Sequence, residues 1–145
     1  MTLRYWAEKG WIRPHRASRE EISKLLAIVE RDLNDTKTNV SADWRFGIAY
    51  NAALKLCTIL LHSEGYRTSH GRHHYRTIHA LPLIMGKSKK TEAEYLNLCR
   101  IKRNSAEYEY TGVATEKDVE ELVDFAEEFK QEIEAWLRKK HPEFI

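Results

Sequence analysis

The sequence predicts an all-α fold, an antiparallel bundle of four main helices with an additional short helix. Apolar residues recur three and four positions apart along several long segments, which is the spacing of one helix face. Only three prolines and six glycines interrupt the 145 residues, and no useful length alternates as a strand does. Residues 1–17 are expected to form an irregular N-terminal arm, and residues 18–145 a single helical domain.

The first two main helices are marked by capping residues. Ser18 is the expected cap of a helix that runs to about residue 34, with the Glu21 side chain reaching back to complete a capping box. Ser41 begins the second helix, which is apolar on most sides in its second half and ends at Gly65. That composition predicts a central, well-buried helix.

Three further helices are expected in the second half of the chain. A short one covers about His73 to Met85, where Pro82 kinks or shortens it. Another covers about residues 91–107, and the last begins after Thr115. Pro142 stops this last helix, whose apolar inner stripe is Val119, Leu122, Val123, Ala126, Phe129, Ile133, Trp136 and Leu137.

Composition limits the class of protein. The formal net charge of +2 is too small to require a polyanionic partner, although local patches matter more than the sum. No apolar run is long enough to cross a membrane, and the first residues lack a signal-peptide core. We therefore expect a cytoplasmic protein without membrane contact, with Cys57 and Cys99 as buried thiols, and the sequence indicates no cofactor.

The stretch KRNSAEYEY, residues 102–110, is one candidate for chemistry. On a helix Arg103 and Asn104 share a face with Arg100, and an arginine fork is suited to phosphate oxygens. Tyr108 and Tyr110 would add hydroxyl groups to such a site. The alternative is a salt-bridged helix end with the tyrosines packed over the core.

The segment HSEGYRTSHGRHHYRTIHALP, residues 62–82, is the second candidate. It holds five of the seven histidines, including His73 and His74, interleaved with arginines such as Arg72 and Arg76 and with tyrosines. Its spacing matches no strong zinc template, so no metal site is predicted. A basic, aromatic-bearing segment suits nucleic acid or phosphate, and a polar loop with capping histidines is the alternative.

A third, weaker candidate lies at the start of the second helix. Asp43 and Arg45 precede Tyr50 in the string DWRFGIAYNAAL. Arg45 and Tyr50 are expected to line the same polar seam as Arg103.

The string RNSAEYEY resembles the signature of the HEPN superfamily, all-α bundles that carry an arginine, a polar residue and a histidine four to six residues on. One frequent version reads Arg-Asn, three residues, His, one residue, Tyr. Arg103, Asn104 and Tyr110 match it, and Tyr108 stands in place of the histidine. With RFGIAYNAALKL, GRHHYRTIHALP and EAWLRKKHP, the chain looks like a small prokaryotic HEPN branch over about residues 18–142.

The resemblance implies an RNA-directed role. Many HEPN proteins are metal-independent endoribonucleases of toxin-antitoxin or defence systems that act as homodimers. Others are inactive antitoxin-like or accessory partners of nucleotidyltransferases. The resemblance therefore implies RNA or a nucleotide as ligand, a homodimer, and an antitoxin or a nucleotidyltransferase as a further partner.

Tyr108 decides between these roles. A tyrosine, with a pKa near 10, is a poor base at pH 7 and costs about 4 kcal/mol relative to a group matched to that pH. Either His73 or His74 replaces the motif histidine in an RNA-cleaving enzyme, or the protein binds RNA without cutting it. A third hypothesis is a purely structural dimer in which Arg103 pairs with Glu107 or Glu109.

Overall fold

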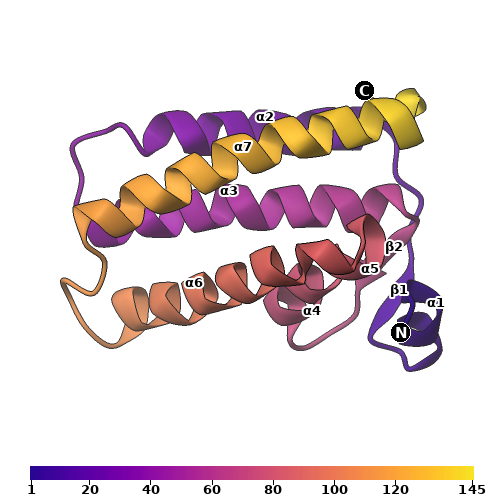
Figure 1. Cartoon of the computed structure of the whole chain (residues 1–145), viewed down its shortest axis with the longest axis horizontal. Coiled ribbons are helices and arrows are strands. Elements are labelled where there is room, and N and C mark those ends of the chain that lie inside the picture. The colour runs from indigo at the N-terminus through magenta and orange to yellow at the C-terminus, as the bar shows by residue number, and fades with distance from the viewer.

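The computed structural model describes the backbone of all 145 residues and every side chain except those of Glu107 and Tyr108. The elements in chain order are α1 (Leu3–Glu8), β1 (Ile12–Pro14), α2 (Arg19–Asp35), α3 (Ala42–Ser63), β2 (Tyr66–Thr68), α4 (His73–His79), α5 (Leu81–Met85), η1 (Lys87–Lys89), α6 (Lys90–Tyr108), α7 (Glu116–Lys140) and η2 (Pro142–Phe144). The structure is mostly helical, which confirms the all-α class. The long helices α2, α3, α6 and α7 lie side by side (Figure 1).

Helix α3 is the centre of the molecule. It packs against α2, α6 and α7, and the side chains of its second half are buried around most of its circumference. Tyr50, Leu56 and Leu60 are among its fully buried residues. Helix α3 therefore confirms the expectation of a central, buried helix that begins after Ser41.

Helices α2 and α7 are amphipathic and cover α3. The capping box of α7 is formed by Thr115 and Asp118, and its buried stripe is Val119, Leu122, Ala126, Phe129, Ile133 and Leu137. The cap of α2 differs from the prediction. Ser18 accepts a hydrogen bond from the backbone N–H of Glu21, but the Glu21 carboxylate does not reach back to the Ser18 backbone. It contacts two histidines instead.

The N-terminal arm is regular rather than irregular. Helix α1 is followed by β1, which pairs antiparallel with β2 in register Ile12↔Thr68. Trp6 and Ile12 are buried with Leu61 and Ala80 in a second, small apolar cluster. Each of the two strands has three residues, which is too short for an alternating pattern to show in the sequence.

The predicted helix over residues 73–85 is divided into α4 and α5. Pro82 has no N–H to donate to the carbonyl of Ile78, and Ala80 separates the end of α4 from the start of α5. Helix α6 spans the range predicted for it and ends before Gly112, whose φ of 71° suits the turn into α7. Cys57 and Cys99 are buried free thiols.

None of the helices whose residues the structure describes has the length and apolar character that crossing a bilayer requires.

Candidate functional site

A pocket lies between α4 and α6 and has a volume of about 340 Å³. Its lining combines residues from the segment 62–82 and from α6, the two main candidates of the sequence analysis, although they are about thirty residues apart in the chain. The lining residues are Arg72, His73, His74, Tyr75, Arg100, Arg103 and Asn104. The structure thus brings together Arg103, Asn104, His73 and His74 with the predicted binding residues Arg72 and Arg100.

Three guanidinium groups dominate the charge of this pocket. The Arg72 guanidinium lies 4.1 Å from the centroid of the Tyr75 ring, and that of Arg100 lies 5.9 Å from it. Arg100 Nε donates to Asn97 Oδ1 at 3.0 Å, which fixes the direction of that side chain. None of the described side chains that line the pocket is acidic. The pocket therefore attracts anions.

His74, which lines the pocket and is partly buried, contacts a buried tyrosine of α3. Tyr50, on α3, is fully buried, and its hydroxyl lies 3.1 Å from Nδ1 of His74. Burial raises the pKa of Tyr50, so the hydroxyl keeps its proton and donates it to Nδ1. The guanidinium of Arg103 lies 5.8 Å from the centroid of the Tyr50 ring.

His74 is held neutral by its surroundings. Burial lowers the pKa of His74, and the positive charges of Arg103 and Arg100 lower it further. Because Nδ1 accepts the Tyr50 proton, the neutral ring carries its own proton on Nε2. His74 is therefore a hydrogen-bond donor at neutral pH.

His73 is placed differently from His74. It is exposed, and its Nδ1 lies 3.1 Å from Thr68 Oγ1. When the ring donates from Nδ1 to that hydroxyl, Nε2 is left as an acceptor. Of the two pocket histidines, His73 is the one suited to accept a proton.

Two predicted arginines lie away from the pocket. Arg45 donates to the carbonyl of Thr36 at 2.9 Å and to Glu116 at 2.6 Å, and it joins the loop after α2 to the start of α7. The guanidinium of Arg76 lies 3.8 Å from the centroid of the Trp11 ring and packs on the N-terminal arm. Both arginines have structural contacts, and neither lines the pocket.

Of the two predicted tyrosines, Tyr110 has a described side chain and Tyr108 does not. Tyr110 follows the end of α6, is 66% exposed and does not line the pocket. The Tyr108 side chain lies outside the described side chains, so its predicted role stays a prediction.

The sequence pattern found one neighbour of the pocket in part and missed another. Tyr50 was expected in a seam with Arg45 and Arg103; it lies beside Arg103, and its hydroxyl contacts His74 rather than Arg45. Asn97 was not identified, although its spacing of three residues before Arg100 on α6 is a signal for such a contact. The remaining histidines of the predicted segment have other roles; His79, for example, stacks on Tyr75 with ring centroids 4.1 Å apart.

No family model matches this chain, and no curated protein or solved structure is similar to it. The resemblance to HEPN proteins therefore remains a hypothesis, and the assignment of function depends on the geometry of the α4–α6 pocket.

Proposed function

We propose that this chain is a HEPN-like protein that binds RNA through a backbone phosphate held in the α4–α6 pocket. The observation that carries the proposal is the convergence of Arg72, Arg100 and Arg103 on one pocket. Arginine forks bind phosphate oxygens in pairs of hydrogen bonds, and the Asn104 amide can donate one more. A nucleotide phosphate would be bound by the same groups.

The pocket recognises phosphate rather than base. Arg72 lies over the Tyr75 ring at 4.1 Å, while His79 stacks on that ring at the same centroid distance. Since both groups pack on the ring, a base would stack on Tyr75 only by displacing one of them. Binding is therefore expected to depend little on RNA sequence.

The Tyr50–His74 pair favours binding over cleavage. Metal-independent cleavage of RNA needs a base that accepts the proton of a 2′-hydroxyl group. Nδ1 of His74 already accepts from Tyr50, and Nε2 carries the ring proton, so His74 donates to a phosphate oxygen instead. The main proposal is thus an RNA-binding protein that does not cut.

Cleavage is a second candidate function, favoured by the position of His73. This exposed ring lines the same pocket, and its Nδ1 contact with Thr68 leaves Nε2 to accept a proton. In that case His73 takes the place of the motif histidine. Incubation with labelled RNA in the presence of EDTA decides between the two functions: intact RNA supports binding alone, and fragments lost in His73→Ala support cleavage.

The binding proposal is tested by fluorescence anisotropy with a labelled single-stranded RNA. Arg103→Ala and Arg100→Ala should each weaken binding by about tenfold or more, because each removes a charged hydrogen-bond donor. Each should also lower the salt-dependence slope of the affinity by about 0.7, the value for one phosphate contact on a single strand. Arg138→Ala, the same charge change at an exposed arginine of α7, is the matched control.

The control decides how a loss of binding is interpreted. If Arg138→Ala weakens binding as much as Arg103→Ala, the RNA contacts general positive charge and the pocket proposal is wrong. If none of the three variants changes the affinity, the same conclusion follows.

A homodimer belongs to the same proposal. Helix α6 exposes Leu98 (66%) and Ile101 (49%), large apolar side chains on the helix that carries Arg100 and Arg103. A dimer through this helix would cover both side chains and bring two pockets near each other. Light scattering after size exclusion should give twice the chain mass for the wild type and a monomer for Ile101→Glu.

A further inference from the structure

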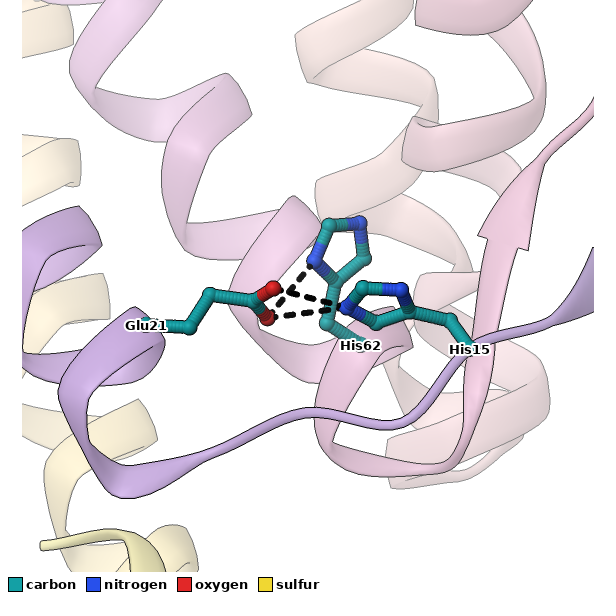
Figure 2. Close-up of side chains that lie close together, drawn as sticks. All are labelled: His15, Glu21 and His62. Atoms are coloured by element: carbon teal, nitrogen blue, oxygen red, sulfur yellow. Dashed lines mark hydrogen bonds and ion pairs between the residues drawn. The ribbon is translucent and has the colours of Figure 1, made fainter.

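Three side chains from separate segments meet outside the α4–α6 pocket. His15 follows β1, Glu21 lies in the first turn of α2, and His62 lies in the last turn of α3. Figure 2 shows both rings directing a nitrogen at the same carboxylate. His15 Nε2 lies 2.8 Å from Oε1 and 3.0 Å from Oε2 of Glu21, and His62 Nδ1 lies 3.2 Å from the same Oε2.

We propose that His15, Glu21 and His62 bind a divalent transition-metal ion, with Zn²⁺ as the best match. Two imidazoles and one carboxylate are the ligand set of open zinc sites, in which water fills the fourth position. One donor atom from each residue lies within 4.8 Å of the other two. Ligands about 2.0 to 2.1 Å from a tetrahedral zinc are about 3.3 to 3.4 Å apart. The observed separations from the carboxylate are already close to that value.

The surroundings hold the ligands in place. The backbone N–H of His15 donates to the carbonyl of Gly65 at 2.8 Å, and the β1–β2 pairing ends next to it. The N–H of Glu21 is fixed by Ser18, and His62 belongs to a buried helix. All three side chains are partly shielded, with exposed fractions of 17% for His15, 31% for Glu21 and 18% for His62. Binding therefore requires little reorganisation.

An ordinary histidine–glutamate contact looks different in this chain. His141 Nε2 lies 2.7 Å from Glu64, and its other ring nitrogen lies 3.3 Å from Glu143. The two carboxylates are bound by opposite nitrogens of a single ring, so they cannot share one ion. At Glu21, in contrast, two rings converge on one carboxylate from the same region, with centroids 4.4 Å apart.

The charge balance sets one condition on the site. The positive charge of Arg67 acts on His62 and opposes a cation there. The Glu21 carboxylate must supply the compensating charge, since the two imidazole ligands are neutral when they bind metal. Loss of this charge in Glu21→Gln should therefore weaken binding of the ion, even though the side chain keeps its shape.

A bound ion would join the N-terminal arm to the ends of α2 and α3. His15 is the ligand from the arm, and the other two come from the bundle. None of the three residues lines the α4–α6 pocket, so this proposal and the RNA proposal succeed or fail separately.

The test is a Zn²⁺ titration of protein that has been freed of any purification tag and stripped with EDTA, in competition with a chromophoric chelator. We expect one tight equivalent in the wild type. His15→Ala, Glu21→Gln and His62→Ala should each lower the Zn²⁺ affinity by more than about tenfold. Substitution of a residue that only supports a metal ligand can already cause a loss of that size. Substitution with Co²⁺ should give the visible absorption of a tetrahedral site in the wild type and not in these three variants.

His141→Ala is the matched control, because it removes a histidine from a histidine–glutamate contact that does not converge with a second ring. It should leave the affinity and the Co²⁺ spectrum unchanged. Glu21→Gln retains a hydrogen-bonding side chain, and circular dichroism checks that each variant is folded. The proposal is overturned if the folded Glu21→Gln and His62→Ala proteins bind Zn²⁺ as the wild type does, or if His141→Ala loses it equally.

Discussion

The hydroxyl of Tyr50 lies 3.1 Å from Nδ1 of His74, and this contact sets the chemistry of the α4–α6 pocket. Tyr50 is fully buried, so its proton has His74 as its acceptor among the described residues. The consequence is a fixed tautomer of His74 with the ring proton on Nε2. A ring in this state donates to a phosphate and does not take a proton from a ribose.

Tyr50→Phe tests this relationship directly. Removal of the hydroxyl leaves Nδ1 without its donor and should lower the free energy of unfolding by about 1 kcal/mol, as for one hydrogen bond. Nitrogen-15 NMR should show the Nε2–H tautomer of His74 in the wild type and a mixture in the variant. Tyr5→Phe, at an exposed tyrosine, should change neither quantity. A His74 spectrum unaffected by Tyr50→Phe would contradict the assigned donor.

The pH dependence of stability follows from the lowered pKa of His74. The folded state holds this ring neutral, whereas the unfolded state protonates it near pH 6.5, so the unfolded chain binds more protons below that pH. Stability should therefore fall as the pH decreases through 6.5 towards the folded pKa. His74→Asn cannot titrate but can still accept from Tyr50.

Urea unfolding at pH 7.5 and 5.5 measures this effect. The loss of stability between the two pH values should be smaller in His74→Asn than in the wild type. His62, whose pKa is also lowered by burial, contributes a loss of the same sign in both proteins. An equal loss in wild type and variant would show that His74 is not held neutral.

Asp43 provides a prediction about the fold. Its carboxylate accepts from the backbone N–H of Gly112 at 2.7 Å and from that of Ala114 at 2.9 Å, and so ties the α6–α7 loop to the start of α3. Asp43→Ala should lower the free energy of unfolding by about 2 kcal/mol, because charged hydrogen bonds to two amides are lost. Asp124→Ala, on the surface of α7, should change it by less than about 0.5 kcal/mol. Equal effects of the two substitutions in urea unfolding would refute the anchoring role.

The positions of the long helices were predictable because local chemistry determines them. Ser18, Ser41 and Thr115 each accept a hydrogen bond from a backbone N–H three residues on, as the sequence predicts. The N-terminal arm was not predictable in this way. Its strand pairs Ile12 with Thr68, and its order depends on packing between segments far apart in the chain.

The pocket could be predicted in part, because some of its residues are related by local spacing along one helix. Arg100, Arg103 and Asn104 share a face of α6 that the sequence spacing reveals, whereas the approach of His73 and His74 to that face depends on packing between helices. Arg45 was wrongly associated with Tyr50, because five residues on a helix place two side chains about 140° apart. The group of His15, Glu21 and His62 could not be found from spacing, since its members come from three distant segments.

The central claim is that the α4–α6 pocket holds an RNA phosphate, and side-chain NMR tests it most directly. A short single-stranded RNA is titrated into ¹⁵N-labelled protein while the arginine Nε and histidine ring resonances are followed. The claim predicts saturable shifts at Arg100, Arg103 and His74 Nε2, with Arg45 and Arg138 unchanged. Shifts confined to residues outside the pocket, or saturable binding without any shift at Arg103 and His74, would contradict it.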